Sequence, residues 1–206
     1  MKNDQIPLPR LIVGLGNPGS EYEHTRHNTG VDFLMLLSDE WKIPMRSESR
    51  FFGMCGKGSI RDHEVRLLFP ETFMNESGKS VGAVCSFYKI RPEEVLVVHD
   101  DLDLKPGQMK LRFGGGFAGH NGLKSIGQYF GNSQNFLRLR IGIGMPPSRD
   151  VISWVLGRPF GADKDATSAA FKCALGAMDV LYSKGLDRAT MAVNGFKIRQ
   201  NDLPYL

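Results

Sequence analysis

The sequence predicts an α/β protein: a single three-layer domain whose mixed, mainly parallel central sheet is flanked by helices. Two short runs, residues 10–14 and 95–98, are apolar without alternation, as strands buried on both faces of a parallel sheet are. Strand-like and helix-like segments alternate along the chain, which favours helices packed on both sides of one sheet. No linker, internal repeat or low-complexity stretch divides the 206 residues, a length that one domain commonly has.

The individual elements follow from hydrophobic spacing and from the residues that end each run. Apolar residues recur at helical spacing between Val31 and Trp41, and Pro70 ends the second of two strand-like runs. Apolar and basic residues alternate at 136–143, which predicts a strand with Arg138 and Arg140 directed toward solvent. In order, we expect a strand at 10–14, a helix at 31–41, strands at 51–59 and 64–69, a helix at 77–88, strands at 95–98 and 110–113, a helix at 120–130, a strand at 136–143 and a helix at 163–184.

Composition and the chain ends narrow the class of protein. Hydrophobic residues make up 41% and charged residues 23%, the balance of a globular protein in water. The three cysteines are odd in number and far apart, so they indicate neither a disulfide framework nor a paired-cysteine zinc site, and we expect a reducing compartment, the cytoplasm. No run approaches the roughly 18 apolar residues of a membrane span. We expect a flexible tail at 1–9, the folded domain at 10–195 and a second tail at 196–206.

Polar residues follow three of the predicted core strands. Asn17 comes after the first strand, Asn75 lies in the polar segment after Phe69, and Asp100 follows the run at 95–98. In open α/β sheets, ligands bind outside the carboxyl ends of the strands. If these strands are parallel neighbours, the three polar side chains meet in one cleft. Taken alone, each is equally well explained as a turn residue or a helix cap.

His27 is the candidate general base. It opens the helix after the first strand, where the positive end of the helix dipole disfavours imidazolium and favours the neutral form that a base needs. Asp100 would accept the Nδ1 hydrogen and leave Nε2 to take a proton from water. A surface or capping histidine is the alternative. No G-x-S-x-G turn indicates a nucleophilic serine, and no ligands at zinc spacing accompany His24 and His27, so we expect no metal and direct attack by water.

A different function is suggested by residues 14–19, which satisfy the dinucleotide-binding pattern G-x-G-x-x-G after a strand. A dinucleotide-dependent oxidoreductase needs a helix that starts inside the glycine turn, so that its N-terminus meets the pyrophosphate. Here Pro18 and a polar run delay the helix, and no strand ending in an acid follows about twenty residues on. We therefore interpret these glycines as a loop that lets Asn17 approach a ligand closely.

Several longer segments resemble the bacterial-type peptidyl-tRNA hydrolase family. They occur in the family's order between about Arg10 and Gly157: GLGNPGSEYEHTRHNTG, TFMNESG, HDDLDL, GGGFAGHNGLKS and FLRLRIGIG. The resemblance implies a monomeric α/β enzyme without a cofactor. Its reaction would be hydrolysis of the ester between a peptide and the 3′-terminal ribose of tRNA, which releases free tRNA and recycles stalled peptidyl-tRNA. A non-catalytic RNA-binding relative with the same fold is the alternative.

The resemblance also assigns roles to residues. His27 would be the catalytic base and Asp100 its partner. The family implies a substrate-binding cleft formed by Asn17, Tyr22, Phe73, Met74, Asn75 and Asn121, although Phe73 and Met74 are equally explained as core residues. The sequence departs from the family at Phe117-Ala118, where His-Gly is expected, so contacts of this loop with the substrate are in question.

Basic residues concentrate after Asp100 and suggest where tRNA binds. The net charge is only +4, which permits an anionic partner without requiring one. We expect phosphate contacts from four side chains: Lys105, Arg112, Arg138 and Arg140. A merely solvated basic face is the alternative.

Overall fold

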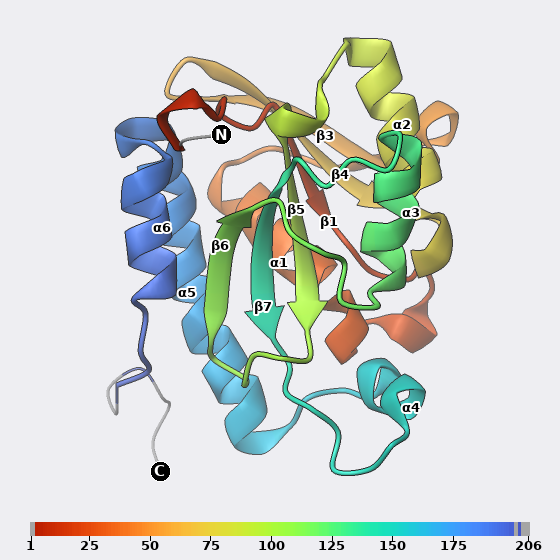
Figure 1. Ribbon diagram of the computed structural model, residues 1–206, viewed down its shortest axis with the longest axis vertical. Coiled ribbons are helices and arrows are strands. Elements are labelled where there is room, and N and C mark those ends of the chain that lie inside the picture. Colours follow the sequence, from red (N-terminus) through yellow and green to blue (C-terminus); the bar gives the residue numbers. More distant parts are fainter. Residues whose placement is uncertain (1–2, 200–201, 203–206) are drawn as a thin grey trace.

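The computed structural model describes residues 3–199 and residue 202 (Figure 1). Across these residues, seven strands form one sheet in the order β2-β3-β4-β1-β5-β7-β6. The strands are β1 (Leu11–Gly14), β2 (Arg46–Glu48), β3 (Gly53–Ile60), β4 (His63–Pro70), β5 (Val95–Asp101), β6 (Met109–Phe113) and β7 (Leu137–Gly142). The four central strands, β4, β1, β5 and β7, run parallel, while β2, β3 and β6 pair antiparallel with their neighbours. The predicted mixed, mainly parallel sheet is confirmed.

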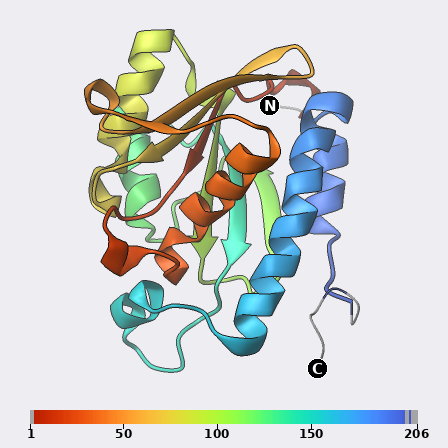
Figure 2. The same cartoon turned by 180° about the vertical axis from the view of Figure 1, so that it is seen from behind.

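Helices cover both faces of this sheet. The helices are α1 (Thr29–Glu40), α2 (Ser77–Tyr88), α3 (Asn121–Tyr129), α4 (Val151–Leu156), α5 (Gly161–Lys184) and α6 (Leu186–Asn194). Helices α2 and α3 lie on one face, and α1 and α5 lie on the other, as the two opposite views show (Figures 1 and 2). The side-chain period of two divides β1, β4 and β5 between two cores, so that Ile12 packs toward α1 and α5 while Leu11 and Val13 pack toward α2 and α3.

Three elements were not predicted: β2, α4 and α6. Helix α6 packs along the edge strand β6, and its buried face joins the core under α5. Among the described residues, no helix combines the length and the apolar character needed to cross a membrane.

Part of the predicted N-terminal tail is packed on the domain. Ile6 is only 8% exposed and belongs to the core, and the Tyr182 hydroxyl donates to the Pro9 carbonyl at 2.7 Å. Burial of Ile6 gives this segment the apolar contacts that a flexible tail lacks. In the predicted C-terminal tail, Phe196 packs against the same core. The rest of that prediction, residues 200–201 and 203–206, lies outside the described residues.

The predicted solvent-facing side of β7 is wrong for Arg138. Strand β7 is paired along both edges, with β5 and β6, and Arg138 on one of its faces is only 3% exposed. Alternation gives two faces of a strand but does not say whether a loop covers the polar one. Here the segment that leads to α3 covers it, because Arg138 Nη1 donates to the Gly116 carbonyl at 2.6 Å.

The N-terminus of α1 lies directly against the end of β5 because residue 30 has no side chain. A Cβ at Gly30 would overlap the carbonyl oxygen of Val98 and would lie 2.7 Å from the Leu15 nitrogen. The close approach brings the turn before α1 to the carboxyl end of β5. This turn carries His27, and the end of β5 carries Asp100.

We predict that Gly30→Ala destabilises the protein by about 1–3 kcal/mol, because the added methyl group overlaps backbone atoms that cannot move independently. Gly176→Ala is the matched control, since nothing lies within 4 Å of a Cβ at Gly176 in the middle of α5. This control should gain roughly 0.5–1 kcal/mol from the lower entropy of the unfolded chain. Urea unfolding measures both changes, and equal stabilities of the two variants would contradict the close contact.

Candidate active site

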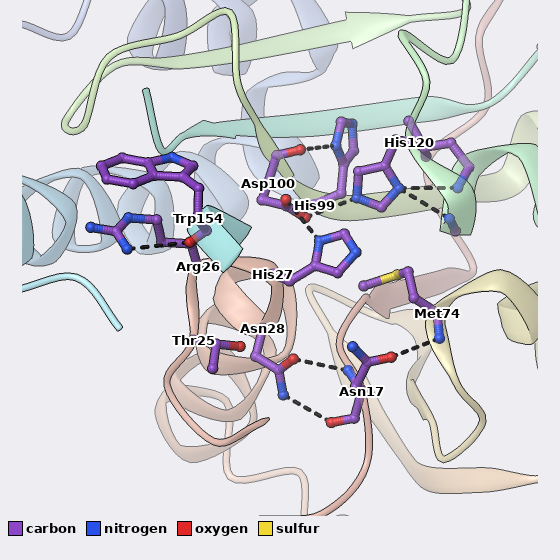
Figure 3. A network of polar contacts seen from close by, with 12 residues as sticks. Asn17, Thr25, Arg26, His27, Asn28, Met74, His99, Asp100, His120 and Trp154 are labelled. Atoms are coloured by element: carbon purple, nitrogen blue, oxygen red, sulfur yellow. Dashed lines mark hydrogen bonds and ion pairs between the residues drawn. The ribbon is translucent and has the colours of Figure 1, made fainter. Parts of the chain in front are cut away.

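His27 and Asp100 meet at the carboxyl edge of the sheet. His27 lies in a 3-10 turn, η3 (Arg26–Asn28), immediately before α1, and Asp100 is the penultimate residue of β5. The two side chains are 2.9 Å apart, from His27 Nδ1 to Asp100 Oδ2 (Figure 3). Because a carboxylate only accepts hydrogen bonds, Nδ1 carries the hydrogen and Nε2 is left with its lone pair.

A second histidine binds the other oxygen of the same carboxylate. His120 Nε2 lies 2.8 Å from Asp100 Oδ1 (Figure 3). His120 is also the N-cap of α3, and its Nδ1 accepts hydrogen bonds from the backbone nitrogens of Gly122 and Leu123 at 3.1 and 3.3 Å. Since Nδ1 accepts, the hydrogen of the neutral ring must be on Nε2, where it donates to Asp100. The tautomer of His120 is therefore fixed by the helix that it caps.

The charge of Asp100 controls protonation in this group. Burial alone would raise the pKa of the Asp100 carboxyl, but the two histidines that face it hold that pKa well below its usual range. Burial also acts to lower the pKa of His27, yet the Asp100 charge and hydrogen bond outweigh it and raise that pKa above its ordinary value of 6.5. The helix dipole was expected to lower the pKa of His27 and keep the ring neutral. The Asp100 carboxylate raises that pKa instead, and its effect is the larger one.

A third histidine, His99, is buried beside this group. Its Nδ1 hydrogen is donated to the backbone carbonyl of Asp100 at 2.8 Å, and its ring lies against that of His120, with the centroids 5.1 Å apart. Burial, followed by repulsion from His120, lowers the pKa of His99 to about 3. The ring therefore stays neutral and fixes the backbone at Asp100.

The cluster of His27, Asp100 and His120 has the composition of a metal site, with ligand atoms within 4.8 Å of one another. A metal at His120 Nε2 would require the ring hydrogen to move to Nδ1. That atom already faces two backbone N–H donors, from Gly122 and Leu123. The α3 N-terminus thus opposes the tautomer that a metal needs, so these side chains fit hydrogen bonding better than metal binding.

The three predicted asparagines lie in neighbouring segments, and they differ in role. Asn17 is 8% exposed, and its Oδ1 accepts a hydrogen bond from the Met74 backbone nitrogen at 2.8 Å. Asn28 Oδ1 and Nδ2 bond the backbone nitrogen and oxygen of Asn17, each at 2.9 Å (Figure 3). Asn75 and Asn121 are exposed, and their side chains bond no other described residue. Asn17 therefore holds the loop in place, and the other two amides remain available.

The predicted apolar wall is only partly on the surface. Tyr22 and Phe73 form an edge-to-face pair with ring centroids 6.5 Å apart, and Phe73 is 55% exposed. Met74 is 4% exposed and belongs to the core, and a side chain at Gly122 would meet its Sδ at 2.6 Å. Met74 thus joins the Asn17 loop to the N-terminus of α3 by packing.

A cleft of about 740 Å³ opens beside the histidines. Its floor is the end of β5, and its walls are the glycine-rich segment at 114–119 and one side of α4. Asn121 lines this cleft, whereas Asn17 lines a neighbouring hollow of about 900 Å³ between α1 and α5. Phe117 is anchored in the protein, because its ring stacks on Phe136 with centroids 6.5 Å apart.

The four predicted phosphate-binding residues have different surroundings. Arg112 is exposed at the cleft, and Lys105 is exposed outside it. Arg140 also lines the cleft, and its Nε donates to Asp101 at 2.7 Å, so part of its charge is compensated. Arg138 is buried, and burial, followed by repulsion from Arg112 and Arg140, lowers its pKa to about 10. Arg112 and Lys105 are therefore the most accessible cations of this set.

The glycine loop lacks the geometry of a dinucleotide site. Helix α1 begins only at Thr29, after two 3-10 turns, η2 (Ser20–Tyr22) and η3. The backbone of Asn17 is occupied by Asn28. The N-terminus of α1, the helix that follows the glycine turn, therefore lies too late in the chain to meet a pyrophosphate bound at that turn.

Three residues of the site were not predicted from the sequence. His120 was expected only as the first residue of a helix, and His99 and Asn28 received no role. A capping residue that also reaches a carboxylate 20 positions away has no local signal, because the contact depends on how β5 and α3 are placed. The repeated histidines near strand ends were the only hint.

The fold and the cleft define a class: an α/β protein with a histidine–carboxylate pair at the carboxyl edge of a mainly parallel sheet. Over residues 11–201, the chain matches the family of peptidyl-tRNA hydrolases. It is 50% identical over 190 residues to a peptidyl-tRNA hydrolase from Haemophilus influenzae, covering 92% of this chain and 98% of that protein. The identity to one from Edwardsiella ictaluri is 48% over 189 residues, covering 91% and 96%.

A solved structure of a peptidyl-tRNA hydrolase has the same fold as this chain. The crystal structure of peptidyl-tRNA hydrolase from Acinetobacter baumannii is 44% identical, with a TM-score of 0.88 over 92% of this chain and 96% of that chain. The chain therefore belongs to the peptidyl-tRNA hydrolase family, and it is a hydrolase. The family predicted from the sequence segments is confirmed.

We predict two different neutral tautomers at the site: hydrogen on Nδ1 in His27 and on Nε2 in His120. The pKa of His27 should lie above 6.5 and should fall in Asp100→Asn, because the carboxylate charge that raises it is removed. Long-range ¹H–¹⁵N NMR over a pH titration measures both the tautomers and the pKa. Hydrogen on Nδ1 of His120 would contradict the proposed cap and donor arrangement.

Proposed function

We propose that this protein hydrolyses the ester bond between a peptide and the 3′-terminal ribose of tRNA, with water activated by His27 and with Asp100 as the partner of His27. The observation that carries the proposal is the 2.9 Å contact from His27 Nδ1 to Asp100 Oδ2. It leaves Nε2 of a cleft-lining ring with a free lone pair, which is the position of a general base. No cofactor or metal takes part in the proposed reaction.

The proposed reaction follows the usual course of ester hydrolysis by water. His27 Nε2 takes a proton as the water oxygen attacks the ester carbonyl, and Asp100 stabilises the imidazolium that forms. The exposed amides of Asn75 and Asn121 donate to the oxyanion or to the peptide backbone. When the intermediate collapses, the imidazolium returns the proton to the leaving ribose oxygen, which releases free tRNA and a free peptide.

The substrate surfaces are assigned by chemistry and exposure. Tyr22 and Phe73 offer an apolar surface beside the Asn17 loop for the peptide end. Arg112 and Lys105, with a smaller contribution from Arg140, bind tRNA phosphates. Arg138 is buried and supports the cleft from inside. The cleft is complete within one chain, so we propose a monomer that acts in the cytoplasm, where stalled peptidyl-tRNA is recycled.

The direct test compares N-acetyl-aminoacyl-tRNA with unblocked aminoacyl-tRNA as substrates. The wild-type protein should cleave the first, and His27→Ala should lower its single-turnover rate by roughly 10²–10⁴-fold. Because His27 is not part of either core, the variant should stay folded, although the loss of one donor to the buried Asp100 carboxylate should lower its stability by about 1–3 kcal/mol. A fully active His27→Ala would remove the proposed base, and an inactive wild-type protein would remove the proposed reaction.

The two-histidine arrangement makes a specific prediction about Asp100→Asn. An amide has one acceptor oxygen, and His120, with its tautomer fixed by α3, should take it. The NH₂ group would then face His27 Nδ1 and force the hydrogen onto Nε2, which abolishes the base. We expect a loss of roughly 10³–10⁴-fold in the chemical step, with tRNA affinity nearly unchanged.

When His120→Asn is added to Asp100→Asn, the single-turnover rate should be about tenfold higher than that of Asp100→Asn alone. The amide oxygen of residue 100 is then free to turn to His27 and accept its Nδ1 hydrogen. Asparagine also remains a good N-cap for α3. His120→Asn alone should cost activity, since Asp100 loses one donor. Single-turnover rates of the wild type, both single variants and the double variant are compared. A double variant no faster than Asp100→Asn would contradict competition between the two histidines for one oxygen.

The proposed phosphate contacts are tested by salt dependence. Lys105→Gln combined with Arg112→Gln should weaken tRNA binding and reduce the slope of log K against log salt concentration by roughly one per lost contact. Lys172→Gln, at an exposed position on α5 far along the chain, is the control for net charge. Equal slopes in all three proteins would show that the basic residues are merely solvated.

A further inference from the structure

One side of helix α4 lines the cleft, and the other side packs against Arg26 and Gly144. Val151, Ile152 and Val155 line the cleft that contains His27. Trp154 does not line it; its indole Nε1 donates to the Gly144 carbonyl at 2.9 Å, and its ring lies against Arg26 (Figure 3). This helix has only six residues, and its main packing contact is with the turn η3. Its position therefore depends on what Trp154 contacts.

Arg26 holds Trp154 from the residue next to the proposed base. Its guanidinium carbon lies 3.6 Å from the centroid of the Trp154 ring, and its Nη1 donates to the Trp154 carbonyl at 3.3 Å. The Arg26 backbone nitrogen also donates to the Gly157 carbonyl at 2.9 Å, just after the helix. Arg26 thus contacts the ring of Trp154, the last turn of α4 and the segment that follows this helix.

The surroundings of Arg26 make this contact specific. Arg26 is 5% exposed and forms no ion pair with any described residue. Burial lowers its pKa, while the charge of Asp163 acts to raise it. The indole face and the Trp154 carbonyl are therefore the near groups that compensate a buried cation. A lysine keeps the charge but cannot stack as a plane on the ring.

We propose that Arg26 and Trp154 form a strap, a pair of positioning residues that sets the distance between the apolar cleft wall on α4 and His27. Neither side chain reaches the reacting atoms. The strap acts by holding Val151, Ile152 and Val155 where the substrate bound at His27 can contact them. This inference rests on the proposed function of His27 as the base in the same cleft.

The expected effect falls on substrate binding more than on chemistry. His27 is held independently by Asp100, and the backbone bond from Arg26 to Gly157 does not depend on the side chain. Loss of the strap should leave the base in place and release the wall. We therefore expect KM to rise about tenfold while kcat stays within about threefold, and the pH dependence of kcat to keep its midpoint.

The test uses Arg26→Met, Arg26→Lys and Trp154→Leu, assayed with N-acetyl-aminoacyl-tRNA. Arg26→Met and Trp154→Leu should both raise KM, and Trp154→Leu should raise it somewhat more, because it also loses the Nε1 bond to Gly144. Their combination should add little to Trp154→Leu, because the stack between the two side chains is already gone. Arg26→Lys should fall close to Arg26→Met, since the planar stack is lost although the charge remains. Arg149→Met is the matched control, because it removes an exposed arginine just before α4 that bonds no described residue through its side chain.

Three outcomes would overturn the strap: an unchanged KM in folded Arg26→Met and Trp154→Leu, multiplicative effects in the combined variant, or a KM in Arg149→Met as high as in Arg26→Met. The last would mean that lost positive charge, and not the position of α4, weakens tRNA binding.

A readout without substrate separates this inference from the proposed function. The chain has two tryptophans, so Trp41→Phe leaves Trp154 as the sole indole fluorophore. In that background, Arg26→Met should shift the emission to longer wavelength and increase acrylamide quenching, and Arg149→Met should not. Unchanged emission and quenching would overturn the strap even if the enzyme is active. If the wild type does not cleave the substrate, the proposed function fails, whereas a shifted emission would still support the strap.

Discussion

The two hydrogen bonds received by the Asp100 carboxylate are the interaction on which the site depends. A buried charge is costly unless donors compensate it, and here the donors come from opposite sides of the sheet. His27 precedes α1 on one face, and His120 caps α3 on the other. The carboxylate at the end of β5 therefore joins both helical layers to the centre of the sheet. The same contacts that orient the proposed base also hold the layers in register.

This arrangement explains why the two histidines differ although they share a partner. His120 has both ring nitrogens occupied, one by Asp100 and one by the backbone of α3, so it has no lone pair left for chemistry. His27 is bonded only at Nδ1, and its other nitrogen belongs to the cleft. The helix N-terminus thus converts one imidazole into a fixed donor, while the other keeps the free lone pair that the proposed base requires. His99, which burial keeps neutral, donates to the backbone carbonyl of Asp100 and so fixes the backbone that carries the shared carboxylate.

The sequence was sufficient for the parallel centre of the sheet and for the proximity of His27 and Asp100, because both follow from local patterns. Continuous apolar runs marked β1 and β5, and polar residues just after parallel strands must meet at one edge. The sequence did not predict features that depend on contacts with a distant segment or on a very short element. His120 needs the placement of α3 to reach Asp100, and α4 has too few residues for a helical period. Arg138 alternates correctly, yet only the fold reveals the loop that covers it.

The buried Arg138 also gives a physical account of the departure at Phe117-Ala118. The Arg138 guanidinium lies 4.6 Å from the Phe136 ring centroid and 5.2 Å from that of Phe117, and it donates to the Gly116 carbonyl. Repulsion from Arg112, directly opposite on β6, makes this cation costly to bury. An aromatic face compensates a cation better than an imidazole that can itself be protonated. Phe117 is therefore directed into the protein, where it supports Arg138 and fixes the glycine-rich wall, and the cleft keeps its polar lining through His120 and Asn121.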